Sequence, residues 1–108
     1  MIKHIVMWKL KNKADAGMMK DKLEGLIGKI PGLIKLEVGV NIDDSAQSAD
    51  VELYSELESE EALAGYQAHP EHQAVVPWVK AATISRTVVD YKVECNLQHA
   101  HANVSCRT

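Results

Sequence analysis

Two side chains that could perform acid–base chemistry, Tyr66 and His72, stand on either side of a His69-Pro70 pair. Proline disfavours helical angles at the preceding residue but suits a first helical position, so we expect one helix to end near Ala68 and another to begin at Pro70. Such a break could bring the phenol and the imidazole to one opening. Histidine, with a reference pKa of about 6.5, can act as a base at neutral pH, and a tyrosine hydroxyl can donate to a developing oxyanion. The pair suits removal of a proton α to a carbonyl; the alternative is that Tyr66 packs in the core and His72 packs or caps a helix start.

His4 is a third candidate, because it is the one polar member of an otherwise apolar strand face. In the strand predicted over Ile2–Leu10, it shares that face with Ile2, Val6, Trp8 and Leu10. A buried imidazole needs a hydrogen-bond partner. His4 is therefore either a core histidine satisfied by a backbone carbonyl or a tyrosine hydroxyl, or a substrate-binding group at the bottom of a pocket.

Metal binding is the least favoured use of the histidines. His69 with His72, and His99 with His101, have spacings that could ligate a metal. Structural zinc usually takes four Cys or His ligands, so the tail that carries Cys95 and Cys106 would have to fold back across the domain. We expect no metal site, and we expect His69 to hydrogen-bond the backbone at the helix break instead.

The elements that position these residues follow the order β-α-β-β-α-β. Asp15 can cap the first helix, and Pro31-Gly32 stops it. Ser59 can cap the second helix, which ends before Pro70. A new helix begins at Pro70, and Pro77 is expected to kink it. Two helical stripes are predicted, the first at Met19, Leu23, Leu26, Ile27 and Ile30 and the second at His72, Val75, Val76 and Val79. Two strands show alternation, one at Ile34, Leu36, Val38, Val40 and Ile42 and the other at Val51, Leu53 and Leu57. A last strand is predicted over Ile84–Val93. This order predicts an α+β, ferredoxin-like fold with a four-stranded antiparallel sheet and both helices on one face.

The other face of that sheet predicts a homodimer. It would carry large apolar side chains among charges: Ile5, Met7, Tyr54, Val89 and Tyr91. Such a face is unfavourable in water but suits packing against the sheet of a second copy. We therefore expect the chain to pair with itself.

Composition limits the remaining partners. The 108 residues suit one domain, predicted over residues 1–93 with a C-terminal extension over 94–108. Net charge is −3 without a clustered basic face, so no nucleic-acid partner is expected. The short apolar N-terminal run reads as a strand and not as a signal peptide or membrane span, and the two cysteines suggest free thiols in a cytoplasmic protein.

Three segments resemble the stress-responsive dimeric α/β-barrel (Dabb) family: Ile2–Lys11, the Tyr-x-x-His-Pro-x-His motif of Tyr66–His72, and Arg86–Tyr91. The resemblance spans about residues 1–93 and implies a dimeric α/β barrel. Most members have no established activity. A few plant and microbial members are polyketide cyclases, which catalyse aldol condensation of a linear poly-β-keto substrate without cofactor or metal.

The resemblance also implies roles for individual residues. Tyr66 and His72 match the catalytic pair of a plant cyclase in the family, and His4 matches a histidine that lines its pocket. A further pocket histidine on the third strand corresponds to Val51 here, so the pocket floor is expected to differ. The residues expected to bind substrate are His4, Val6, Trp8, Val51 and Leu53.

Three functions remain open from the sequence. The first is a cofactor-free lyase or cyclase that binds or cyclises a small polyketide-like molecule, with His72 as base and Tyr66 as donor. The second is a non-catalytic dimeric module that binds a small apolar molecule. The third, and least favoured, is a monooxygenase of the wider dimeric-barrel group, because a shared fold does not carry function. The first two differ in whether one cavity holds His4, Tyr66 and His72 together, and a filled core there would leave only the non-catalytic module.

Overall fold

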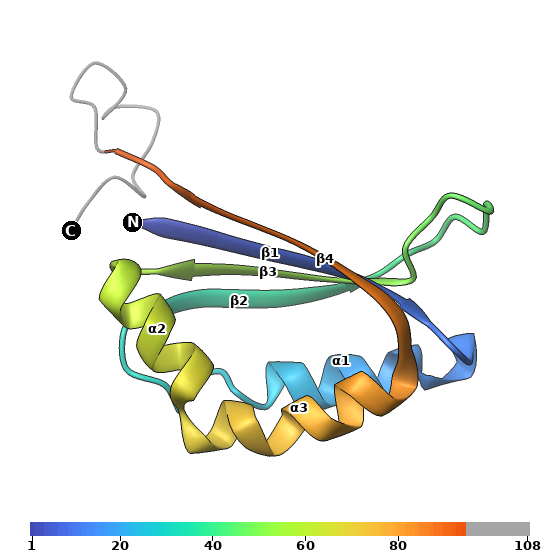
Figure 1. The fold of residues 1–108 in the computed structure, drawn as a ribbon, viewed down its shortest axis with the longest axis horizontal. Coiled ribbons are helices and arrows are strands. Elements are labelled where there is room, and N and C mark those ends of the chain that lie inside the picture. Colours follow the sequence, from blue (N-terminus) through green and yellow to red (C-terminus); the bar gives the residue numbers. More distant parts are fainter. Residues whose placement is uncertain (95–108) are drawn as a thin grey trace.

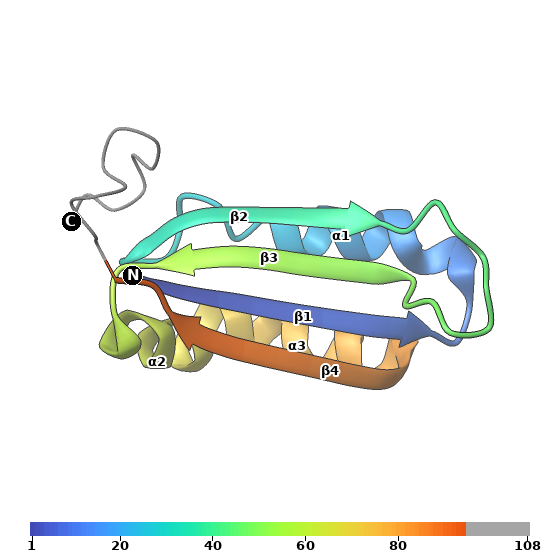
Figure 2. The same ribbon diagram turned by 90° about the horizontal axis from the view of Figure 1, so that it is seen from above.

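The computed structural model describes residues 1–94, which form four strands and three α-helices in two layers (Figures 1 and 2). In chain order the elements are β1 (Ile2–Leu10), a 3₁₀ turn (Lys13–Asp15), α1 (Ala16–Glu24), β2 (Leu33–Val40), β3 (Val51–Leu57), α2 (Glu60–Ala68), α3 (Pro70–Ala82) and β4 (Thr83–Lys92). The strands lie in the order β2-β3-β1-β4, with every pair antiparallel. Figure 1 shows all three helices on one side of the sheet. The predicted ferredoxin-like fold is confirmed.

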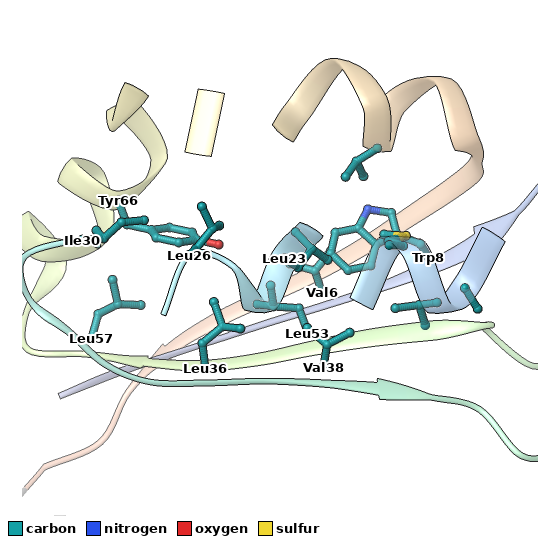
Figure 3. Close-up of a cluster of buried hydrophobic side chains, with 14 of the residues drawn as sticks. Val6, Trp8, Leu23, Leu26, Ile30, Leu36, Val38, Leu53, Leu57 and Tyr66 are labelled. Atoms are coloured by element: carbon teal, nitrogen blue, oxygen red, sulfur yellow. The ribbon is translucent and has the colours of Figure 1, made fainter. Parts of the chain in front are cut away.

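The core fills the space between the sheet and the helices (Figure 3). The predicted inner face of β1 is buried throughout, from Ile2 through His4, Val6 and Trp8 to Leu10. Met19 and Leu23 of α1 and Tyr66 of α2 cover it from the helical side. The alternation in β1 therefore places His4 under the helices, as the sequence predicts.

The helix break is also confirmed, since α2 ends at Ala68 and α3 begins at Pro70. Between them His69 is extended, with φ −63° and ψ 137°. Its Nδ1 accepts a hydrogen bond from the Glu71 amide at 3.1 Å, so His69 caps α3 as expected. Pro77 lies inside α3, which continues through it to Ala82.

The first helix is shorter than predicted. It ends at Glu24, and the chain continues through turns with bonds from Leu26 N to Leu23 O and from Lys29 N to Leu26 O, both at 3.1 Å. Gly28 has φ +81°, which is incompatible with a right-handed helix. Ile27 consequently faces solvent, although Leu26 and Ile30 remain buried. At the start, Asn12 and not Asp15 supplies the side-chain cap, accepting from Ala14 N at 3.0 Å.

The second strand differs from the predicted alternation at both ends. The β2–β3 register shifts between Leu33 and Lys35, and Ile34 is left exposed while Leu33 packs against the core. The strand ends at Val40, which is exposed, as is Ile42 beyond it. The bulge moves Ile34 out of the two-residue period, and Val40 and Ile42 lie at and beyond the end of the strand. Only Leu36 and Val38 of the predicted set are therefore buried.

A buried carboxylate that the sequence analysis did not single out fixes the end of β1. Asp50 accepts a hydrogen bond from Leu10 N at 2.8 Å, and its own amide donates to Trp8 O at 2.8 Å. The β1–β4 register shifts between Lys9 and Leu10, close to this contact. Asp50 therefore holds the irregular end of the strand that carries Trp8.

Two glycines with positive φ provide a matched stability test. Gly32 has φ +80°, and a Cβ there would lie 2.6 Å from the Cβ of Ala62, whereas Gly28 has φ +81° with nothing within 4 Å. We expect Gly28→Ala to lower the free energy of unfolding by about 1–2 kcal/mol through backbone strain alone. Gly32→Ala should cost about 1–3 kcal/mol more, because the added methyl overlaps α2. Urea denaturation measures both, and equal losses would show that α2 moves aside without cost.

The face of the sheet opposite the helices is mixed, as predicted. Met7, Val89 and Tyr91 are exposed there, and Ile5 is half-buried opposite Val89 in the β1–β4 register. Tyr54 donates its hydroxyl to Glu56 Oε2 at 2.5 Å. Burial is the largest cause that raises the pKa of Tyr54, and the Glu56 carboxylate raises it further. The ammonium groups of Lys3 and Lys35 each lie 5.7 Å from the centroid of the same ring.

Candidate functional site

A cavity of about 510 Å³ lies between the sheet and α3. This volume is within the range of small-molecule sites. The inner face of β1, α3 and the start of β4 form most of its wall, and Leu23 of α1, Leu53 of β3 and Tyr66 of α2 complete it. His4, Tyr66 and His72, the three side chains expected to share a pocket, all line it.

His72 lies near the start of α3, held by the backbone at the helix break. Its Nδ1 is 3.1 Å from the carbonyl oxygen of Gln67. A carbonyl oxygen only accepts, so the Nδ1 of His72 carries the proton and donates it. In the neutral ring Nε2 is then unprotonated and available as a base.

The surroundings of His72 favour this neutral form. Burial is the largest cause that lowers its pKa, and the charges of His4 and Arg86 lower it further, against the raising effect of the Gln67 hydrogen bond. Desolvation disfavours the charged imidazolium, as does a nearby guanidinium. His72 is therefore unprotonated at neutral pH.

Tyr66 packs against His72 ring to ring. The two ring centroids are 4.6 Å apart at an interplanar angle of 45°. Figure 3 shows the Tyr66 ring in the layer between helices and sheet. Its hydroxyl has no hydrogen-bond partner among residues 1–94, and it does not bond to the imidazole of His72. Burial raises the pKa of Tyr66 to about 12, so the phenol stays protonated and can donate to a bound oxygen.

His4 is paired with a carboxylate that the sequence analysis missed. Its Nδ1 contacts Oδ1 of Asp90, which lies directly opposite it on β4. A carboxylate accepts from Nδ1–H, and this orients the ring and leaves Nε2 free. The His4 ring stands edge-on to Tyr66 at a centroid distance of 5.9 Å. The pairing register, and not any local motif, brings Asp90 to this place.

The other residues expected to bind substrate divide into two groups. Val6, Trp8 and Leu53 line the cavity. Val51 is not part of its wall; it is buried opposite Trp8 in the β1–β3 register. It packs in the core beside Trp8, at the first position of β3, and Leu53 is the residue of β3 that reaches the cavity wall. Two further lining residues, Lys80 and Arg86, were not singled out from the sequence.

Within residues 1–94 no three His, Cys, Asp or Glu side chains gather as they would around a metal ion. His69 is engaged in capping α3. The expectations for His99, His101, Cys95, Cys106 and most of the extension at 94–108 lie outside the described residues. None of the helices described is long and apolar enough to cross a membrane.

Comparison with known families identifies the chain. The family model described as the stress responsive A/B barrel domain (Dabb) matches residues 2–93. The chain belongs to the Dabb family. No curated protein matches it in sequence.

Solved structures with the same fold include a protein of unknown function and proteins named as enzymes. A dimeric protein of unknown function and ferredoxin-like fold from Bacteroides fragilis is 32% identical, with 85% of this chain and 95% of that chain covered and a TM-score of 0.75. The hydroxynitrile lyase from Passiflora edulis is 14% identical, covering 89% and 95% of the two chains with a TM-score of 0.74. An antibiotic biosynthesis monooxygenase is 18% identical, covering 86% and 98% with a TM-score of 0.70. The last two are similar in fold alone, so no activity passes from them to this Dabb chain.

Proposed function

We propose that the cavity binds a small, largely apolar compound of the polyketide type and that His72 removes a proton α to one of its carbonyls. One observation carries the proposal. His72, tied to Gln67 O through Nδ1, has an unprotonated Nε2 in the same cavity as the unpaired hydroxyl of Tyr66. A base and an oxyanion donor beside one substrate are the two groups that enolate formation requires.

The proposed reaction needs no oxidant or reductant. Nε2 of His72 takes the α proton, and the C–H electron pair forms the enolate, whose oxygen accepts a hydrogen bond from Tyr66. The enolate carbon then attacks a second carbonyl of the same chain, forming the ring carbon–carbon bond. The imidazolium returns its proton to the new alkoxide. The apolar wall of Val6, Trp8 and Leu53 would keep bulk water from the enolate.

We further propose that the protein is a homodimer paired through the outer face of the sheet. Met7, Val89 and Tyr91 are exposed on that face, and Ile5 is half-buried among them. The Bacteroides fragilis relative is described as dimeric. Sheet-to-sheet packing would cover this apolar strip and leave the cavity, on the opposite face, accessible from the helical side.

Enolate formation can be measured without knowing the natural substrate. Ethyl benzoylacetate deuterated at C2 is a small β-keto compound, and in H₂O its deuterium is lost only after C2 is deprotonated. We expect the protein to accelerate the appearance of the C2 proton signal by NMR above the protein-free rate. Saturable binding of the same ester without faster C2 exchange would show that the protein is a binding module and not an enzyme.

A further inference from the structure

The charged side chains in the cavity wall are all basic. Lys80 of α3 and Arg86 of β4 line it, and none of the lining residues within 1–94 is Asp or Glu. The chain as a whole has 15 acidic and 12 basic residues, so the absence of carboxylates runs against its composition. Asp90, which does not line the cavity, contacts the lining residue His4.

Neither cation is neutralised within the described part of the chain. Other lysines have partners: Lys20 with Glu24 at 3.3 Å, Lys29 with Glu71 at 3.4 Å and Lys35 with Glu37 at 3.9 Å. Lys80 and Arg86 make no ion pair or hydrogen bond with any side chain of residues 1–94. Within residues 1–94, both cations at the cavity wall are therefore available to a ligand.

Arg86 is placed to act on a ligand that also reaches His72. It lies opposite Trp8 in the β1–β4 register, on the inner face of β4. Its charge contributes to the lowered pKa of His72 and offsets part of the rise that burial causes in the pKa of Tyr66, as expected of a guanidinium near both rings. The same wall includes the apolar side chains of Val6, Leu53 and Val79.

We propose that the ligand of this cavity is an apolar carboxylate, whose carboxylate binds the guanidinium of Arg86 while its apolar body extends toward Tyr66 and His72. This inference rests on the proposed function, because it names the class of molecule that the same cavity takes. A guanidinium presents paired N–H donors that match the two oxygens of a carboxylate, and Lys80 adds a second positive charge at the wall.

The test compares two ligands of equal shape, 2-naphthoate and the neutral 2-naphthamide, by isothermal titration calorimetry. The parent protein should bind 2-naphthoate about tenfold or more tightly than the amide, as a charge-assisted hydrogen bond provides. Arg86→Gln should abolish that preference and leave the affinity for 2-naphthamide within about twofold, because the apolar wall is unchanged. Lys92→Gln removes one positive charge from the same strand outside this cavity and should preserve the preference. Shifts of the His72 imidazole NMR signals place both ligands in the cavity.

The outcomes separate this inference from the proposed function. Equal affinities for the two ligands, or an Arg86→Gln protein that keeps the preference, would overturn the carboxylate assignment and leave the enolate chemistry standing. If neither ligand binds and the His72 signals do not move, the cavity is not a ligand site and both proposals fall. A preference for 2-naphthoate that is lost in Arg86→Gln and kept in Lys92→Gln would support the carboxylate assignment, and acceleration of C2 exchange by the parent protein would support the proposed function.

Discussion

His72→Gln lowers the protein-catalysed rate of C2 exchange in ethyl benzoylacetate by about 10²–10⁴-fold, which is the usual contribution of a positioned general base. The amide of glutamine can still hydrogen-bond near Gln67 O, but it has no basic nitrogen to accept the substrate proton. His72 is half-buried at the helix break, so the substitution should leave the fold intact. NMR with deuterated ester measures the rate, and urea denaturation checks the fold.

His69→Asn is the matched control for this substitution. It also removes an imidazole at the α2–α3 break, three residues away, and asparagine is a good N-cap that can replace the bond to Glu71 N. His69 does not line the cavity. Exchange should therefore stay at the parent rate. A folded His72→Gln protein with the parent rate would exclude His72 as the base.

Ile5→Lys weakens the proposed homodimer by at least about 10²-fold in dissociation constant. An unpaired charge buried in a packed interface costs about 3–5 kcal/mol, and a two-fold axis would place the substitution in the interface twice. Ile5 lies at the centre of the outer face, opposite Val89 on one side and Tyr54 on the other. Light scattering at micromolar concentration should give twice the chain mass of 11.9 kDa for the parent and the chain mass for the variant.

Met18→Lys is the control for dimerisation. Met18 is an exposed apolar residue of α1, on the helical side of the molecule, and its replacement adds the same charge to a different surface. This variant should remain dimeric. A parent protein that is monomeric at micromolar concentration would contradict the proposed dimeric barrel. An Ile5→Lys protein whose dimer is as stable as the parent's would show that the interface lies on another face.

Local rules in the sequence predicted much of what positions the site. Proline geometry alone set the break at His69, and the two-residue alternation of β1 placed His4, Val6 and Trp8 under the helices. The errors arose where a single residue interrupts a period. Gly28 with its positive φ ended the helical stripe early, and the bulge at Leu33–Lys35 exposed Ile34.

The residues missed at the site depend on how distant strands pair. Asp90 and His4 are 86 positions apart, and only the β1–β4 register makes them neighbours. The same register places Arg86 opposite Trp8. Alternation along the last strand could have assigned Arg86, Val88 and Asp90 to one face, but not which residues of β1 they would meet.

The pH dependence of C2 exchange by the parent protein tests the central claim most directly, because it reports the protonation state of the group that removes the proton. Burial lowers the pKa of His72 below its usual value of about 6.5, so the rate should rise with pH through a midpoint below 6.5 as the imidazolium loses its proton. Above that midpoint the rate should stay level to at least about pH 8, because Tyr66, with a pKa of about 12, remains a donor. A midpoint above 6.5, or no acceleration at any pH by a protein that binds the ester, would contradict His72 as the base.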